Sequence, residues 1–300
     1  MISICIPIYN FSVTDLANSL HTQCLALQIP FEILLIDDAS YSIFKNENAA
    51  LAQLNHVVYK DLNENIGRAS IRNRLASIAQ YNFILFMDCD SELCDPNFIK
   101  NYVQEIGSTT DVVCGGRIYP NKPVDKSLLL HWKYGSQIES KTAPERQLHP
   151  YHSFMTNNFM IRKDIFKTIE FNENLKGYGH EDTLFGMELA NKHYAIQHIN
   201  NPVRHIQLES TEEFIDKTYH SIQNLIYIYK ISPQIKEYAK LLRITITNAN
   251  TLRIISLLLK PFEFILTTYY KRNGHSLFLF QLYKAIILIR THASYCRNIN

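Results

Sequence analysis

The stretch from residue 83 to residue 90 places a run of apolar residues directly before two carboxylates. Phe83 to Met87 are all apolar, and Asp88 and Asp90 follow at once. This pattern predicts a buried strand that leaves the core and ends at an acidic edge. Ligands of open α/β sheets bind outside the carboxyl ends of the strands, so the two acids are placed to hold a divalent cation and, through it, phosphate oxygens. The alternative is an ordinary strand end followed by a polar turn over residues 91–96.

Strands and helices alternate through most of the chain, which predicts an α/β fold with a Rossmann-like, mixed but mainly parallel sheet flanked by helices. The second strand also ends in a carboxylate pair, Asp37 and Asp38, so acids from two strands are expected on one rim. The alternative for that pair is a motif that starts a turn. The predicted strands are 2–6, 31–36, 57–60, 83–87, 112–119, 158–161 and 194–199, and the predicted helices are 13–28, 43–54, 68–80, 96–106, 163–168, 181–190 and 211–229.

Residues 122–152 form a long polar segment without clear periodicity. Long irregular segments inside a compact domain are usually functional loops. We therefore expect a lid or an acceptor-binding segment here, and it contains the single tryptophan, Trp132.

Composition limits the class of protein. A chain of 300 residues with 46% apolar residues and a formal charge of +2 is expected to be globular, not an acidic disordered chain or a strongly basic nucleic-acid binder. The six cysteines form no Cys-x-x-Cys pair, which argues against a zinc ribbon or a disulfide framework and favours the cytoplasm. The first residues lack the pattern of a secretory signal, and charges interrupt every apolar run that approaches the length of a spanning helix.

The charge is concentrated near the carboxyl end. Residues 241–300 contain eight Lys or Arg against one acid, Glu263, and their apolar residues recur at helical spacing. We predict a catalytic domain over residues 1–230 and a basic amphipathic helical extension over residues 231–300. Such helices can lie in a membrane interface. The alternative is a helical subdomain packed on the catalytic domain or on a second copy of the chain.

Five segments, taken in order, resemble the family 2 glycosyltransferases of the GT-A fold over about residues 1 to 210. They are Ile6-Pro7-Ile8-Tyr9-Asn10, Leu35-Ile36-Asp37-Asp38-Ala39-Ser40, Asn65-Ile66-Gly67-Arg68-x-x-x-Arg72-Asn73, Phe86-Met87-Asp88-Cys89-Asp90 and Gly177-Tyr178-Gly179-His180-Glu181-Asp182. The resemblance implies transfer of a sugar from a nucleotide diphosphate sugar, with UDP as the expected carrier, to an acceptor hydroxyl with inversion. It also implies Mn²⁺ or Mg²⁺ as cofactor and a role in surface polysaccharide or lipopolysaccharide synthesis.

The same resemblance assigns residues to the donor. The backbone of Pro7 and Tyr9 would hold the base together with Asp38, with Asp37 in support. Arg68 and Arg72 lie one helical turn apart, and their guanidinium groups suit pyrophosphate or a ribose-side contact. They could instead be ordinary solvated arginines of a helix surface. The implied donor-binding residues are Pro7, Tyr9, Asp37, Asp38, Gly67, Arg68, Arg72, Asp88 and Asn158. Asn158 and its neighbour Asn157 could bind donor hydroxyls, or they could only pack at a strand entry.

The implied metal ligands are Asp90, Asp88 and His205. Asp90 would ligate the cation directly, and Asp88 would touch the ribose or a water on the metal. His205 follows strand-like residues where some relatives supply another ligand. A packed histidine of the core is the alternative.

The Glu181-Asp182 pair is assigned to the reaction itself. By resemblance, Asp182 is the general base and Glu181 orients the acceptor, although the first turn of a helix favours acids in any protein. Trp132 and Tyr134 could stack on an acceptor sugar or pack in the core. His180 and Tyr178 replace a Gly and a Trp of related galactosyltransferases, so the donor sugar stays open.

Two other functions are compatible with parts of this pattern. A sugar-phosphate nucleotidyltransferase would need a Gly-rich phosphate loop after the first strand, and residues 7–11 contain no Gly. A non-catalytic nucleotide-sugar-binding module would keep the fold without turnover. The expected partners are a nucleotide diphosphate sugar and a saccharide or lipid-linked saccharide acceptor, with no nucleic acid. Contact with the inner face of the cell membrane and a homo-oligomer are further expectations.

Overall fold

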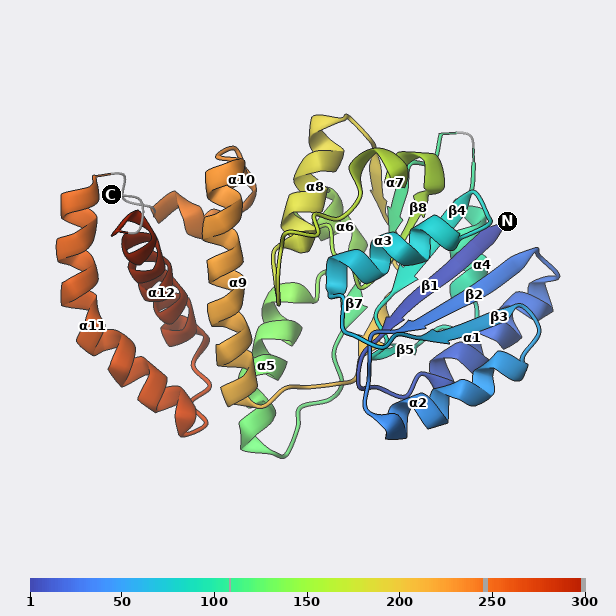
Figure 1. Cartoon of the computed structure of the whole chain (residues 1–300), viewed down its shortest axis with the longest axis horizontal. Coiled ribbons are helices and arrows are strands. Elements are labelled where there is room, and N and C mark those ends of the chain that lie inside the picture. The colour runs from blue at the N-terminus through green and yellow to red at the C-terminus, as the bar shows by residue number, and fades with distance from the viewer. Residues whose placement is uncertain (108, 245–247, 298–300) are drawn as a thin grey trace. The chain divides into compact units, whose positions relative to one another are not determined.

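The computed structural model describes residues 1–107, 109–244 and 248–297, and the chain divides into two compact units. The first unit comprises Met1–Pro120, Ser140–Leu175 and Phe185–Gln207, and the second comprises Asn121–Glu139, Lys176–Leu184 and Leu208–Asn300. Figure 1 labels the helices and strands of both units. The boundary expected between residues 230 and 231 stays a prediction.

A mixed sheet is the centre of the first unit. In the described residues it has seven strands in the order β3-β2-β1-β4-β8-β6-β9. Strands β1 to β4 are mutually parallel, β8 is antiparallel to both β4 and β6, and β9 is parallel to β6. The predicted mainly parallel sheet is therefore confirmed. Its strands are β1 (Ile2–Ile8), β2 (Phe31–Asp37), β3 (Val57–Asp61), β4 (Phe83–Met87), β6 (Val112–Cys114), β8 (Asn158–Arg162) and β9 (Ile196–His198).

The sheet has a core on each face because side chains alternate along a strand. In β1, Ile4 and Ile6 pack with Leu20 of α1 (Thr14–Leu27), whereas Cys5 packs on the opposite face with Leu75 of α3 (Arg68–Ile78). Strands β1 and β2 are buried on both faces, which explains why they read as continuous apolar runs, whereas β3 at the edge of the sheet is mostly exposed.

Helices are divided between the two faces by this alternation. Helices α1 and α4 (Phe98–Gln104) contribute to one core, and α3, α7 (Lys163–Ile169) and α8 (Glu181–Asn191) contribute to the other. Figure 1 shows α1 and α3 on opposite sides of the strands. Phe185 fixes α8 to the sheet, since its ring stacks on those of Phe154 and Phe171 with centroids 5.2 and 4.5 Å apart. The remaining helices of this unit are α2 (Ser42–Ala49), the short η1 (Ala50–Gln53) and α6 (Ala143–Gln147).

A second, three-stranded sheet continues from the end of β4. It has the order β5-β10-β7, with β5 (Ser91–Leu93) antiparallel to β10 (Val203–His205) and β7 (Arg117–Ile118) parallel to it. The register pairs His205 with Ser91, the residue that follows Asp90. This small sheet therefore fixes where the β10 strand ends relative to the acids of the β4 edge.

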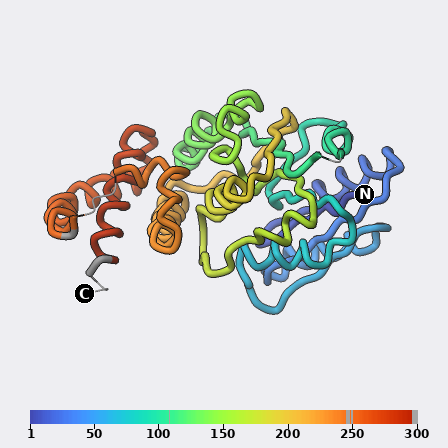
Figure 2. The backbone as a smooth tube through the Cα atoms, turned by 90° about the horizontal axis from the view of Figure 1, so that it is seen from above, coloured from blue at the N-terminus to red at the C-terminus, as the bar shows by residue number. Residues whose placement is uncertain are grey.

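The second unit is helical in the described residues. Helix α12 (Leu277–Arg297) contacts α9 (Thr211–Ile231) through the rings of Phe280 and Phe214, and contacts α11 (Ala249–Lys271) through Tyr270. Figures 1 and 2 show α12 between α9 and α11. The other elements are η2 (Lys126–Leu128), α5 (Leu129–Tyr134), the π turn η3 (Gly135–Glu139), α10 (Ile235–Tyr238) and η4 (Lys240–Ile244). No helix of the described residues is apolar over a length that would cross a bilayer.

Two expectations about single segments, and the alternative given for residues 91–96, were wrong. Residues 112–119 are not one strand but β6 and β7, which belong to different sheets because Gly116 turns the chain with φ of +92°. Residues 91–96 are not only a polar turn, since β5 begins there. Residues 122–152 are not irregular, because short helical elements occupy much of the segment.

Candidate active site

The carboxyl ends of β1 and β2 lie side by side at one edge of the first unit. Ile8 pairs with Asp37, and the Asp38 N–H donates to the Ile8 carbonyl over 2.8 Å. Pro7 lies within β1, and Tyr9 follows the strand with 54% of its surface exposed. The structure thus brings together the four residues predicted to surround a nucleotide base, and the base-binding role itself stays a prediction.

Asp38 anchors the loop that precedes α3. Its two carboxylate oxygens accept the backbone N–H groups of Ile66 and Gly67 over 2.7 and 3.0 Å. Burial raises the pKa of the Asp38 carboxyl, and these two hydrogen bonds offset part of the rise. Gly67 has φ of +87°, a conformation that strains other residues, and it starts α3. One side chain therefore sets the position of the Asn65-Ile66-Gly67 motif against β2.

Asp37 is fully buried and holds the turn after β2. Its Oδ1 accepts the Ser40 N–H over 2.7 Å, and its Oδ2 accepts the Tyr59 hydroxyl over 3.4 Å. Asp37 therefore stabilises the turn that carries Asp38, and its support for a bound base stays a prediction.

Arg72 is a buried residue, not a solvated one. Its side chain is 2% exposed, and its Nη2 lies 2.6 Å from Oδ1 of Asp88. A second nitrogen, Nη1, donates to the carbonyl of Arg68 over 3.1 Å, and the guanidinium lies 5.7 Å from the ring centre of Phe171. The pair orients Asp88 directly after β4. Arg68 itself, in the first turn of α3, is half-buried.

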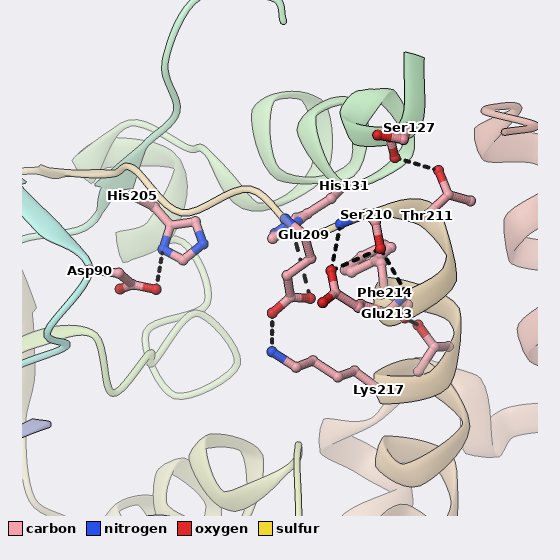
Figure 3. Close-up of polar contacts among 11 residues, drawn as sticks. Asp90, Ser127, His131, His205, Glu209, Ser210, Thr211, Glu213, Phe214 and Lys217 are labelled. Carbon is pink, nitrogen blue, oxygen red and sulfur yellow. Dashed lines mark hydrogen bonds and ion pairs between the residues drawn. The ribbon is translucent and has the colours of Figure 1, made fainter. Parts of the chain in front are cut away.

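Asp90 and His205 form a second pair at this edge. His205 Nδ1 lies 3.2 Å from Asp90 Oδ2, and the Ile206 N–H donates to the Asp90 carbonyl over 3.0 Å. Figure 3 shows the pair on its two strand ends. Burial raises the pKa of the Asp90 carboxyl, but the hydrogen bond and charge of His205 and the charges of Arg117 and Arg68 lower it further, so the net pKa lies below the usual value.

The amino end of β8 meets the same edge because β8 runs antiparallel to β4. The Asp88 N–H donates to the Asn157 carbonyl over 3.1 Å. The Asn158 amide is saturated by the fold: Oδ1 accepts the Tyr102 hydroxyl over 2.6 Å, and Nδ2 donates to the carbonyls of Gly116 and Asn201 over 3.0 and 2.9 Å. The side chain of Asn157 is buried, and neither its oxygen nor its nitrogen has a hydrogen-bond partner among the described residues. Of the two asparagines expected to bind donor hydroxyls, Asn157 is therefore more available to a ligand than Asn158.

The Glu181-Asp182 pair belongs to the second unit, at the start of α8. Asp182 Oδ1 accepts the Thr183 N–H over 2.7 Å, which orients the carboxylate. Asn224 of α9 holds the preceding loop, since its Nδ2 donates to the carbonyls of Lys176, Tyr178 and Gly179 over 2.9 to 3.3 Å. A Cβ on Gly179 would lie 2.5 Å from Oγ of Ser221, so this loop approaches α9 closely.

Tyr134 and Trp132 both lie on α5 in the second unit. The Tyr134 ring packs against Phe214 and Phe280 with centroids 5.6 and 5.4 Å away, and Lys284 Nζ lies 4.7 Å from its centre. Trp132 is half-buried, and its carbonyl accepts the Ser136 hydroxyl. Acceptor binding by these two residues stays a prediction.

A polar cluster that the sequence pattern did not reveal joins α5 to the start of α9. His131 is 5% exposed, and its Nδ1 accepts the Glu209 N–H over 2.9 Å while its ring stacks on Phe214. Lys217 forms an ion pair with Glu209. Figure 3 shows these contacts along the first turns of α9.

The sequence comparison with family models decides the class of the protein. The model described as glycosyl transferase family 2 matches residues 3–170, which is more than half of the chain. The chain belongs to glycosyl transferase family 2. It is therefore a glycosyltransferase, and the predicted family is confirmed. No curated protein matches the sequence.

Solved structures show that this glycosyltransferase has the GT-A fold that was predicted. Staphylococcus aureus TarS 1-349 in complex with UDP-GlcNAc is 18% identical, with a TM-score of 0.52 and coverage of 99% of this chain and 92% of that chain. Glucosyl-3-phosphoglycerate synthase from Mycobacterium tuberculosis, in complex with Mn²⁺, UDP and glucosyl-3-phosphoglycerate, is 17% identical, with a TM-score of 0.51 and coverage of 77% and 79%. Mannosyltransferase PcManGT from Pyrobaculum calidifontis, in complex with GDP-Man and Mn²⁺, is 11% identical, with a TM-score of 0.53 and coverage of 99% and 86%.

The edge of the glycosyltransferase sheet fits the divalent cation that the family implies. Oδ1 of Asp90 is buried and has no hydrogen-bond partner among the described residues. Within residues 1–107, 109–244 and 248–297, no three His, Cys, Asp or Glu side chains lie close enough together to hold a metal ion. Mg²⁺ is commonly bound by one or two carboxylates together with water and substrate phosphates. The three predicted ligands therefore do not form one cluster, since His205 pairs with Asp90 whereas Asp88 pairs with Arg72. Asp90, with one buried oxygen left without a partner among the described residues, fits a site that substrate phosphates and water complete, and the metal-binding role stays a prediction.

The Arg72–Asp88 pair tests how strongly burial increases the stability that is lost when one partner of an ion pair is removed from this glycosyltransferase. Arg72→Met leaves a largely buried carboxylate without its partner, so we expect the free energy of unfolding to fall by about 3 kcal/mol. The matched control is Arg204→Met. Arg204 and Glu92 are also 2.6 Å apart, but their side chains are 38% and 48% exposed, so we expect a loss of about 0–1 kcal/mol. Urea denaturation measures both, and equal losses would contradict the prediction.

The adjacent asparagines Asn157 and Asn158 provide a second test. Asn158→Leu removes the partners of three buried groups, so we expect a loss of stability of about 2–4 kcal/mol. Asn157→Leu replaces an amide that has no partner within the described chain, and we expect a change of less than about 1 kcal/mol. Thermal and urea unfolding of both variants measure the difference. A large loss in Asn157→Leu would show that the fold satisfies this amide after all.

Proposed function

We propose that this glycosyltransferase transfers a sugar from a nucleotide diphosphate sugar, with UDP as the carrier, to an acceptor hydroxyl with inversion at the anomeric carbon. The observation that carries the proposal is Asp90. Its carboxylate lies after β4, at the edge where β1 and β2 also end, with one oxygen held by His205 and the other buried without a partner among the described residues. Solved relatives of the fold contain UDP, UDP-GlcNAc or GDP-Man, which supports the choice of donor class.

The nucleotide is bound at the ends of β1 and β2. A base needs hydrogen-bond partners in fixed directions, and the backbone of Pro7 and Ile8 is fixed by its pairing with β2. Asp38 keeps the Gly67 loop and the start of α3 next to that strand end. Arg68, in the first turn of α3, supplies positive charge for the phosphates or the ribose side.

Asp90 holds Mn²⁺ or Mg²⁺, with His205 and Asp88 in support. A bound cation stabilises the negative charge that develops on the departing nucleotide diphosphate. Arg72 contributes by holding the Asp88 carboxylate in one orientation before the substrate arrives, because the guanidinium is itself fixed by the Arg68 carbonyl and the ring of Phe171. The chain thus supplies a preorganised acidic edge.

Asp182 is the general base. The acceptor oxygen forms its bond to the anomeric carbon as the bond from that carbon to the phosphate oxygen breaks, and the acceptor proton goes to the Asp182 carboxylate. The Thr183 N–H limits rotation of this carboxylate, and Asn224 limits movement of the loop that carries it. Glu181 orients the acceptor, with Trp132 and Tyr134 as further acceptor-binding residues. The acceptor is a saccharide or lipid-linked saccharide of a surface polysaccharide or lipopolysaccharide.

Titration of UDP by calorimetry, with and without Mn²⁺, tests the role of Asp90. We expect Mn²⁺ to strengthen UDP binding in the wild type, and Asp90→Asn to weaken binding in the presence of Mn²⁺ by more than about tenfold. Asp164→Asn is the matched control, since Asp164 is an exposed acid of the same unit that pairs with Arg162. UDP binding that does not depend on Mn²⁺ would argue against the metal-binding role.

Asp182→Asn tests the reaction. We expect turnover to fall by about 10²–10⁴-fold while donor binding stays unchanged, because only proton removal is lost. Glu188→Gln, on the same helix α8, is the control and should keep wild-type activity. The assay is a panel of nucleotide sugars scored for released nucleoside diphosphate.

The same assay separates the alternative functions. Release of pyrophosphate in place of nucleoside diphosphate would indicate a nucleotidyltransferase. Donor binding without turnover on any acceptor would indicate a binding module. Membership of the glycosyltransferase family favours neither outcome.

A further inference from the structure

Helix α11 (Ala249–Lys271) has an apolar face that nothing in the described chain covers. Large apolar side chains recur along it at the spacing of successive helical turns, and each is more than half exposed. They are Ile254 at 62%, Leu257 at 69%, Leu258 at 64%, Phe262 at 55%, Phe264 at 73% and Ile265 at 60%. Exposed apolar residues are common singly, but a contiguous set of this size marks an interaction surface. We call these six residues the outer face of α11.

The opposite side of α11 is already occupied. Leu252, Leu266 and Tyr270 are at most 7% exposed, and the Tyr270 ring contacts Phe280 and Tyr283 of α12. Figures 1 and 2 show α12 between α11 and α9. Packing against α12 therefore explains the buried side of α11 and leaves the outer face without a role in the fold.

A row of positive charge borders the outer face. The row consists of three exposed residues, Arg253, Lys260 and Lys271. Lys260 lies seven residues after Arg253 and Lys271 lies eighteen residues after it, which is about two and five helical turns. They therefore share one flank of the helix, next to Leu257 and Phe264. Arg272 follows directly after the helix and is also exposed. Apolar side chains beside a row of bases are the arrangement that binds at an anionic lipid surface.

No acid of α11 itself balances this row, although Lys271 at its end also lines a pocket with Glu212, Glu213 and Asp216 of α9. The one acid of α11 is Glu263, and it forms an ion pair with Arg290 of α12 on the side away from the outer face. If a second copy used the same face, the bases would meet no acid of α11. An anionic membrane provides both the apolar layer and the complementary charge.

We propose that the outer face of α11 lies in the interface of a membrane that contains anionic lipid, with Arg253, Lys260 and Lys271 against the headgroups. The helix lies on the membrane, consistent with the absence of any spanning helix in the described residues. The inference stands on the second unit alone and does not depend on the donor or the metal of the proposed reaction. If the proposed lipid-linked acceptor is right, it also places the enzyme at its substrate.

Co-sedimentation with vesicles tests the proposal on the full chain. We expect the wild type to pellet with equimolar phosphatidylcholine and phosphatidylglycerol, less with phosphatidylcholine alone, and less again at high salt. The face variant, Leu257→Gln with Leu258→Gln and Phe264→Gln, should lower the partition coefficient by more than about tenfold. The matched control replaces three equally exposed apolar residues elsewhere, Leu25→Gln, Ile43→Gln and Leu148→Gln, which are 50%, 61% and 75% exposed.

A charge variant provides an independent measurement if the face variant fails to fold. Arg253→Gln with Lys260→Gln and Lys271→Gln should lower binding to the anionic vesicles by more than about tenfold and should not change the melting temperature. Its control is Lys100→Gln with Lys122→Gln and Lys192→Gln, three exposed lysines outside α11.

Three results would overturn the proposal. They are equal binding to neutral and anionic vesicles, unchanged binding of the folded face variant, and a wild type that self-associates in analytical ultracentrifugation and binds no vesicles. The last result, with a monomeric face variant, would assign the outer face to a second copy.

Discussion

The two-sided pairing of β4 is the constraint on which the active edge depends. Strand β4 is parallel to β1 on one side and antiparallel to β8 on the other. The carboxyl end of β4 therefore lies beside the carboxyl ends of β1 and β2 and the amino end of β8. Asp88 and Asp90 occupy that point because they are the first polar residues after the apolar strand. A change of register by one residue would turn each of these side chains to the other face of the sheet.

The acids at this edge are each held by a different partner, which is what makes the edge stable before any ligand binds. Carboxylates that leave water need hydrogen bonds or opposite charge. Asp38 accepts hydrogen bonds from two backbone N–H groups, Asp88 pairs with the guanidinium of Arg72, and Asp90 pairs with His205. Of these three acids, Asp90 alone has a buried oxygen without a hydrogen-bond partner among the described residues. This difference, more than the Asp-x-Asp spacing, selects Asp90 as the group that a cation would satisfy.

The sequence was sufficient for the strands and for the acids that follow them, because an apolar run and its polar end are local features. The sequence was not sufficient to predict which residues contact these side chains in the fold. A helix-surface arginine and the buried Arg72 have the same local pattern, and the difference comes from Asp88, sixteen residues away. Asn157 and Asn158 are adjacent and chemically identical, yet only Asn158 meets Tyr102 and two carbonyls. The short strand β5 depends on its pairing with β10, more than a hundred residues away, so no local window of sequence shows it.

Helix α11 shows why a basic flank matters for a helix that is apolar on two sides. A helix that is hydrophobic all round is normally buried, and one left exposed tends to associate without selectivity. One side of α11 is buried against α12, and the apolar side chains of the outer face remain exposed. Bases along its flank repel a second copy of the same helix, because like charges would come together with no acid between them. The same bases attract an anionic surface, so one set of charges both disfavours self-association and favours a membrane. The second unit can therefore keep an exposed apolar face because its charge pattern restricts what that face can bind.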